Sequence, residues 1–134
     1  MSFSSDLQAW IEKASLDANQ VMRSVATEIF TATIVKTPVD SGRLVNNWQV
    51  TYEVPAFGQL DGVDPDRQET INRAKSAVLN APQGVQTLWL TNNLPYAYRV
   101  EYLGWSSVKA PAGMLRVSIA EYQTALRQKV AELT

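Results

Sequence analysis

The sequence predicts an α+β fold in which a long N-terminal helix and a C-terminal helix pack on a small, mainly antiparallel sheet. Three observations carry this prediction. Apolar residues recur every three or four positions near both ends of the chain, as on the buried side of a helix. Two middle segments, about 48–54 and 85–91, are rich in strand-forming residues. The length of 134 residues fits one compact domain, so we expect a single domain over 1–134.

The first element is predicted as one helix over about 5–37. Ser4, Ser5 and Asp6 offer side chains that can cap its start. Pro38 disfavours helical geometry at Thr37 and so ends it. A helix of this length would extend about 45 Å, which is long for a domain of this size. Its apolar stripe consists of Leu7, Trp10, Ile11, Ala14, Ala18, Val21, Met22, Val25 and Ile29.

A strand over about 48–54 should follow, because Trp48, Val50 and Tyr52 alternate with polar residues. Residues 55–80 are predicted as a loop rich in glycine, proline and aspartate and then a helix, with Asp66 and Glu69 spaced as a capping box. The second strand is expected over about 85–91.

Two further helices complete the prediction. A short one is expected over about 95–103, with Pro95 in its first turn. The C-terminal helix is expected over about 113–133, where an apolar stripe returns. This order of helices and strands does not by itself specify a topology.

Composition narrows the possible functions. Twelve basic against thirteen acidic side chains give a net charge of −1, which argues against a domain that relies on binding nucleic acid phosphates. The chain has no cysteine and no histidine, which excludes disulfides, thiolate nucleophiles and Cys/His zinc sites. We therefore expect no enzyme, and no catalytic, cofactor-binding or metal-binding residues. The N-terminal stretch lacks the pattern of a signal peptide, and no apolar run approaches the roughly 20 residues that span a bilayer, so a soluble, non-secreted protein is expected.

The segment "DGVDPDRQE" is the densest acidic stretch, with Asp61, Asp64, Asp66 and Glu69. Its spacing does not fit a calcium loop of the EF-hand type. Aspartate at a helix start is explained by capping and by the helix dipole, and we favour that interpretation.

The segment "TPVDSGRLVNNW" contains unusually many specialised residues. Turn formation explains Pro38, Asp40, Ser41 and Gly42, because proline fixes φ, short polar side chains bond to nearby backbone and glycine permits positive φ. Arg43 is not explained in this way. It could reach the last carbonyls of the preceding helix, pair with Asp40 or contact a neighbouring subunit.

The segment "LPYAYRVEYLGWS" holds Tyr96, Tyr98, Tyr102 and Trp105, with Arg99 and Glu101 among them. An aromatic cluster at the edge of the core and a protein–protein interface explain it equally well, since Tyr, Trp and Arg are enriched at interfaces. Stacking on nucleic acid bases is disfavoured by the balanced charge.

Two parts of the sequence together resemble a two-part signature of a phage protein family. The first is "TPVDSGRLVNNW" after a long helix, and the second is "NNLPYAYRVEYLGWS" followed by "KAPAGMLRVSI". This is the tail-completion and neck family, which includes head–tail joining proteins of long-tailed phages and is often labelled minor tail protein Z-like. The resemblance runs from the first helix to Ile119 in the same order. Ser41 stands where the common form has threonine, and residues 55–82 match the variable part of the family.

The resemblance implies a structural virion protein that completes the tail and joins it to the DNA-filled head. Such a protein would form a homo-oligomeric ring, most simply a hexamer, around a channel through which DNA passes without sequence-specific binding. Its partners would be tail-terminator, tail-tube and head-connector proteins, and it would reside in the virion neck or tail after assembly in the host cytoplasm. No cofactor and no membrane contact are implied. The expected subunit or neck contacts are Pro38, Asp40, Arg43, Trp48, Tyr96, Tyr98, Arg99, Glu101, Tyr102 and Trp105.

Other functions stay open at this point. A tail terminator that caps the tail tube belongs to the same structural class. A small carboxylate-dependent hydrolase and a monomeric binding module belong to different classes.

Overall fold

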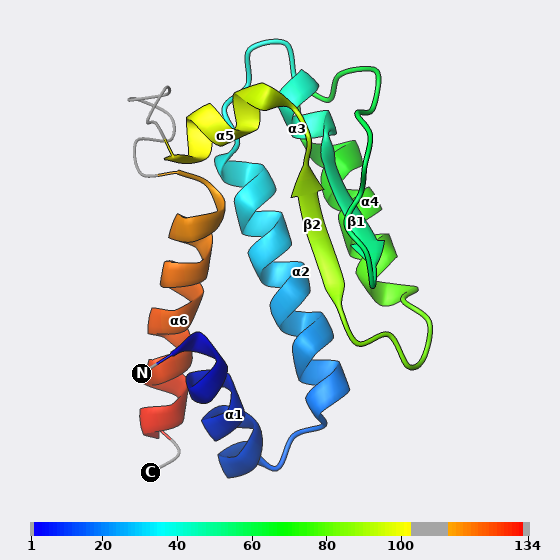
Figure 1. The fold of residues 1–134 in the computed structure, drawn as a ribbon. Coiled ribbons are helices and arrows are strands. Elements are labelled where there is room, and N and C mark those ends of the chain that lie inside the picture. The colour runs from blue at the N-terminus through cyan, green and yellow to red at the C-terminus, as the bar shows by residue number, and fades with distance from the viewer. Residues whose placement is uncertain (1, 103–112, 133–134) are drawn as a thin grey trace.

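A computed structural model describes residues 2–102 and 113–132 of the chain (Figure 1). It confirms an α+β fold with a two-stranded antiparallel sheet. The elements in chain order are α1 (Phe3–Ala14), α2 (Ala18–Lys36), α3 (Arg43–Asn46), β1 (Trp48–Tyr52), α4 (Gln68–Leu79), β2 (Leu88–Asn92), α5 (Pro95–Tyr102) and α6 (Leu115–Glu132).

The prediction of one continuous helix over 5–37 is wrong, because the chain turns at residues 15–17 and forms α1 and α2 instead. Ser15 adopts a left-handed conformation with φ of 53°. The N–H groups of Ser15 and Leu16 then donate to carbonyls in the last turn of α1, the pattern of a Schellman motif. Asp17 caps the start of α2 by accepting hydrogen bonds from two backbone N–H groups of its first turn. Local capping therefore overrides a continuous apolar stripe.

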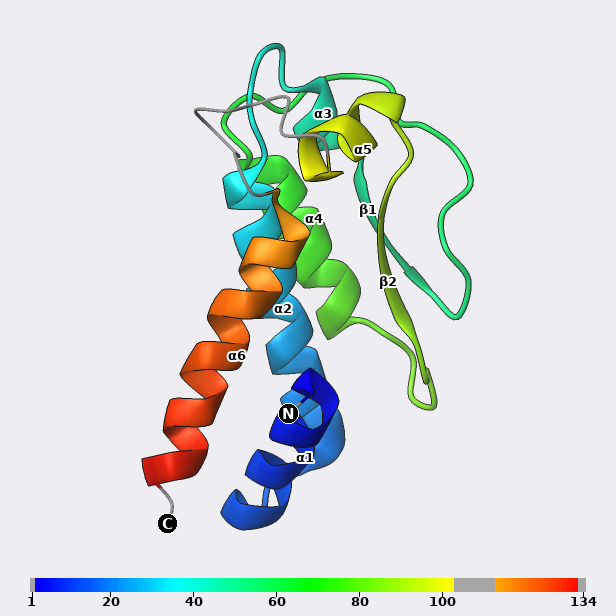
Figure 2. The same cartoon turned by 60° about the vertical axis from the view of Figure 1, so that its left-hand side comes forward.

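Helix α2 is the centre of the fold, with an apolar cluster toward each end. Figures 1 and 2 show α1 and α6 on one side of α2, and α4 with the sheet on the other. The cluster next to the sheet also receives residues of α3 and α5, and its fully buried members are Ile34, Val45, Val100 and Met114. The cluster between α1, α2 and α6 includes Leu7, Val25, Tyr122 and Leu126.

The sheet is shorter than predicted. β1 ends at Tyr52 because Glu53 has a positive φ of 67°, and the Glu53 carboxylate accepts hydrogen bonds from the N–H groups of Gln86 and Thr87. β2 covers 88–92 instead of 85–91 and pairs antiparallel with β1. The Glu53 N–H donates to the Thr87 carbonyl at 2.9 Å. Because such bonds alternate along an antiparallel pair, the N–H and C=O groups of Leu88 and Leu90 point away from β1.

The remaining helix boundaries lie within a few residues of the predictions. α4 begins at Gln68, the last turn of α5 within the described residues ends at Tyr102, and α6 covers 115–132. Helix α3, which lies between the predicted turn and strand, was not predicted. It is a single short turn, and its four residues are too few to produce a recognisable apolar period.

Candidate interaction surface

The turn between α2 and α3 is held by buried hydrogen bonds around Thr37. The Thr37 hydroxyl donates to the Thr33 carbonyl at 2.8 Å and accepts from the Trp48 indole Nε1 at 2.8 Å. The Thr37 carbonyl accepts from Arg67 Nη2 at 2.9 Å. Pro38 and Trp48 are buried. Arg67, and not Arg43, is therefore the arginine that binds a carbonyl at the end of α2.

Gly42 brings this turn against the loop before α4. Its φ is 96°, and a Cβ atom added to it would lie 2.6 Å from the Pro65 nitrogen and 2.8 Å from the Asp64 carbonyl carbon. The Gly42 carbonyl accepts hydrogen bonds from the N–H groups of Asn46 and Asp64. Glycine is required here for its positive φ and for the close backbone approach.

The acidic segment supplies acceptors to the first turn of α4, as expected, but not through the predicted Asp66–Glu69 capping box, because the N-cap residue is Arg67 and its side chain makes no capping bond. Asp64 is only 4% exposed, and its Oδ2 accepts a hydrogen bond from the Thr70 N–H at 2.7 Å. Burial opposes ionisation of Asp64, but the neighbouring hydrogen-bond donors and the charge of Arg73 together outweigh it, so the pKa of Asp64 is lowered. Asp66 accepts from the Gln68 N–H at 3.1 Å. Within residues 2–102 and 113–132, no group of three or more acidic side chains is arranged to hold a metal ion.

Arg43 is exposed at the start of α3 and connects the two halves of the sequence signature. Its Nη2 donates to Gln59 Oε1 at 3.1 Å, and Gln59 Nε2 donates to the Asn93 carbonyl at 3.3 Å, just before α5. Asp40 is also exposed, and no ion pair joins it to Arg43 in the described part of the chain. Two of the three expected roles for Arg43 are therefore not observed, and contact with another subunit stays a prediction.

Helix α5 presents three tyrosines to solvent. Tyr96, Tyr98 and Tyr102 are 40%, 61% and 55% exposed. The Tyr98 and Tyr102 rings lie 5.0 Å apart between centroids, and the Arg116 guanidinium lies 4.7 Å from the Tyr102 ring centroid. These contacts restrict the Tyr98 and Tyr102 rings, and such restriction lowers the entropy lost when a partner binds. Arg99 is exposed on the same helix, whereas Trp105 lies outside the described residues.

Glu101 is buried and caps helix α6 from a distance in sequence. Its carboxylate accepts hydrogen bonds from the N–H groups of Met114 at 2.7 Å, Leu115 at 2.8 Å and Arg116 at 3.1 Å, and from Arg116 Nε at 3.0 Å. Burial opposes ionisation, but these donors outweigh it and lower the pKa of Glu101. Gly113 has φ of 100° and leaves no room for a Cβ atom beside Glu101.

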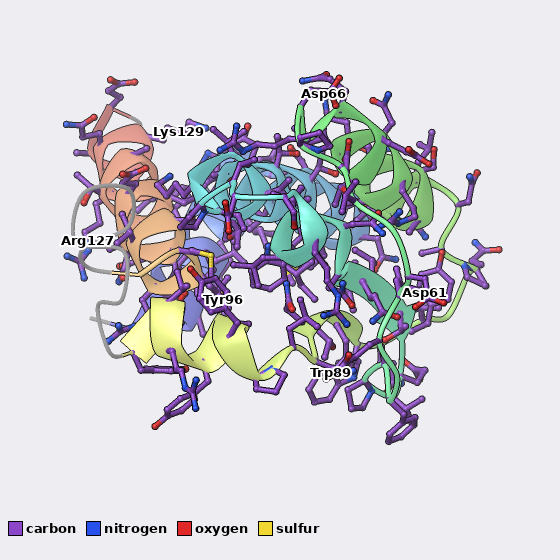
Figure 3. All side chains as sticks on the ribbon, turned by 90° about the horizontal axis from the view of Figure 1, so that it is seen from above. Asp61, Asp66, Trp89, Tyr96, Arg127 and Lys129 are labelled. Carbon is purple, nitrogen blue, oxygen red and sulfur yellow. The ribbon has the colours of Figure 1, made fainter. Side chains whose placement is uncertain are left out.

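The described residues of both halves of the signature meet at one end of the molecule, where α3, α5 and the turn over 37–42 lie together (Figure 1). Figure 3 looks onto this end, with Tyr96 on α5. We call its exposed side chains the motif end: Asp40, Arg43, Tyr96, Tyr98, Arg99 and Tyr102. Of the ten predicted contact residues, Pro38, Trp48 and Glu101 are instead buried, and their hydrogen bonds and packing serve the fold.

Two further surfaces lie outside the ten predicted contact residues. The outer edge of β2 carries no charged residue and no proline, whereas the outer edge of β1 is covered by Arg73, which donates to the Asn46 and Trp48 carbonyls. A groove of about 600 Å³ lies between α2 and the segment leading into β2. Its apolar lining includes Met22, Ala26, Ile29, Phe30 and Leu88. Neither surface has a local sequence signal, because each depends on how distant elements pack.

Comparison with protein-family models, with curated proteins and with solved structures returned no match to this chain. Across residues 2–102 and 113–132, no helix combines the length and the apolar character needed to cross a membrane.

Thr37→Val tests the hydrogen bonds that shape the turn. Valine has nearly the same shape but leaves the buried Trp48 Nε1 without its acceptor. We expect the free energy of unfolding to fall by about 2 kcal/mol, the cost of an unsatisfied buried donor. Chemical denaturation measures this change. Trp48→Phe should reduce the free energy of unfolding by less in the Thr37→Val background than in the wild-type chain. Strictly additive losses would contradict the coupling between Thr37 and Trp48.

Proposed function

We propose that this chain is a structural subunit of a phage neck or tail, which forms a ring and joins the tail to the DNA-filled head. The observation that supports this most is the motif end. Two segments separated by about fifty residues form one exposed surface there, and these are the segments that resemble the family signature. Arg43, Gln59 and Asn93 link them through two hydrogen bonds.

The chemistry of the motif end suits contact with protein. Exposed tyrosine and arginine side chains supply large contact areas, and they are enriched among residues that dominate binding energy. The Tyr98 and Tyr102 rings contact each other at an interplanar angle of 41°, which reduces the entropy that they lose on binding. The outer edge of β2 pairs with no other strand within residues 2–102 and 113–132, and it offers a second element, because its outward N–H and C=O groups can accept a strand from a neighbour.

A ring follows if different surfaces of the same chain contact each other head to tail and the rotation closes. The motif end and the β2 edge are two such different surfaces. A net charge of −1 also fits a conduit for DNA, since rings of basic side chains would retain the phosphate backbone.

Native mass spectrometry of the purified protein, alone and with tail tubes, tests the proposal. We expect a stable ring, or a ring that forms when tubes are added, and we expect tubes carrying this ring to join DNA-filled heads. A strict monomer that ignores tubes and heads would overturn the proposal. A ring that caps tubes but does not recruit heads would instead identify a tail terminator.

Arg43→Ala distinguishes contact between subunits from a role in folding. Arg43 is exposed, so its loss should change the free energy of unfolding by less than about 0.5 kcal/mol. We expect ring assembly to weaken by about tenfold, the effect of losing an interface residue worth about 1.4 kcal/mol. Titration by native mass spectrometry measures the assembly.

Arg67→Ala is the matched control, because Arg67 bonds to the Thr37 carbonyl inside the chain. It should reduce stability and leave assembly of the folded fraction unchanged. If Arg43→Ala instead unfolds the isolated chain and Arg67→Ala does not, Arg43 serves the fold and not the interface.

A further inference from the structure

Residues 3–36 carry the pattern of one straight helix although they fold as two. At 100° per residue, the apolar stripe of a straight helix would fall within about 120° of its circumference. This stripe comprises Leu7, Trp10, Ile11, Ala14, Ala18, Val21, Met22, Val25 and Ile29. There is no glycine or proline between residues 3 and 36. Nothing in the covalent chemistry of residues 15–17 therefore prevents a helix from running through them.

The turn at residues 15–17, which we call the hinge, is strained and exposed. Ser15 occupies the left-handed position of a Schellman motif, where glycine is the usual residue because side chains with a Cβ atom are disfavoured there. Ser15, Leu16 and Asp17 are all exposed. A straight helix would release the strain at Ser15, while it would lose the capping bonds made by Asp17. The strain at Ser15 therefore offsets part of the stabilisation that the capping bonds give to the bent hinge.

Helix α1 is bound mainly through α6. The Asp6 carboxylate accepts from Arg127 Nε at 2.9 Å and from Gln123 Nε2 at 2.8 Å. The Phe3 ring lies 6.0 Å from the Tyr122 ring, and Lys129 Nζ lies 5.0 Å above the Trp10 ring. Leu7 is buried in the cluster that contains Leu126. The surface of α6 is thus complementary to the sequence of α1 in charge, aromatic contacts and shape.

We propose that α1 exchanges between copies of this chain. When the hinge straightens, α1 detaches from α6 of its own copy and binds α6 of another copy. Straightening would carry α1 past the end of α6 (Figure 1) and uncover Leu7 and Leu126. Only a segment with the contacts of α1 restores this surface, so the occupant is α1 of a second copy. Every contact between α1 and α6 re-forms after exchange, and strained hinges of this kind favour such swapping.

This contact lies at the end of α2 opposite to the motif end (Figure 1). It concerns association of the chain with itself, and it stands whether or not the assembly belongs to a phage. Figure 3 shows Arg127 and Lys129 on α6, on the opposite side of the molecule from Asp61.

Two hinge variants shift the equilibrium in opposite directions. Ser15→Gly removes the strain of the left-handed residue and favours the bent hinge. Ser15→Ala combined with Asp17→Ala keeps the strain, removes the cap of α2 and raises helix propensity, so it favours the straight helix. We expect the exchanged fraction in the double variant to exceed that in Ser15→Gly by at least about tenfold. The wild-type chain should lie between them.

Because the chain lacks cysteine, spin labels can be placed without side reactions. One chain carries Gln8→Cys on α1 and a second carries Gln128→Cys on α6, both at exposed positions. The labelled chains are mixed, and pulsed electron paramagnetic resonance measures the distance between them. Because α1 packs on α6, exchange brings the label on α1 of one chain into the distance range of the label on α6 of the other. A population of short intermolecular distances that grows from Ser15→Gly through wild type to the double variant supports the proposal.

The proposal is overturned if the short distance is absent between chains in all three samples, or if its population does not depend on the hinge. If the double variant does not fold, which circular dichroism reveals, the comparison of wild type with Ser15→Gly decides. Native mass spectrometry of the same samples separates this result from the ring. If a ring forms but the short distance between chains is absent, only the proposed exchange of α1 is overturned. If α1 exchanges but no ring forms, only the proposed assembly into a ring is overturned.

Discussion

Gly42→Ala should reduce the free energy of unfolding by about 3 kcal/mol or more. Two penalties combine at this position. An alanine at φ of 96° is strained by about 1–2 kcal/mol. Its Cβ atom would also lie within 3 Å of three backbone atoms of Asp64 and Pro65, which have no flexible side chain to move aside. Chemical denaturation, followed by fluorescence and circular dichroism, measures the loss.

Gly84→Ala is the matched control. Gly84 has nearly the same φ, 93°, but a Cβ atom there meets nothing within 4 Å. It should cost only the conformational strain, about 1 kcal/mol. Equal losses in the two variants would show that contact with the 64–65 backbone does not determine the role of Gly42.

Glu101→Ala should have a comparable effect at the start of α6, for a different reason. It removes the acceptor of three backbone N–H groups and of Arg116 Nε. Hydrogen bonds to a buried charge are worth more than neutral ones, so we expect a loss of about 3 kcal/mol. Glu101→Gln keeps the shape and one acceptor oxygen, and should lose about half as much.

The pH dependence of these variants follows from the lowered pKa of Glu101. The folded protein favours the carboxylate, so its stabilising contribution is fully present above the ordinary glutamate value of 4.5 and is lost as pH falls through the lower folded-state value. We therefore expect the stability difference between wild type and Glu101→Gln to shrink below about pH 4.5. Denaturation at pH 7 and pH 3 measures it. A difference that is the same at both values would exclude Glu101 as a titrating contributor.

The sequence predicted the fold class, the capping role of the acidic segment and the existence of most elements because these depend on local patterns. It failed at residues 15–17, where a serine in a left-handed conformation gives no signal that distinguishes it from a helical serine. The apolar stripe continues through the hinge without interruption, so periodicity alone favours one helix.

The candidate site shows the same limit. Their spacing of four residues places Tyr98 and Tyr102 on one helix face, and their rings contact each other at a tilt of 41°. Glu101 and Trp48 could not be assigned from sequence, because their partners Met114 and Thr37 lie 13 and 11 residues away. Whether a polar side chain is exposed or binds distant backbone depends on tertiary packing, which leaves no local pattern.

The division of the apolar core along α2 has a consequence for energetic coupling. Helix α2 has 19 residues and therefore a length of about 28 Å, with one apolar cluster toward each end. Substitutions that act more than about 10 Å apart without shared partners contribute additively to stability. Changes at Gly42 and changes at the hinge should thus combine by simple addition. Evolution could accordingly adjust the two ends of the molecule independently, with α2 as a fixed spacer between them.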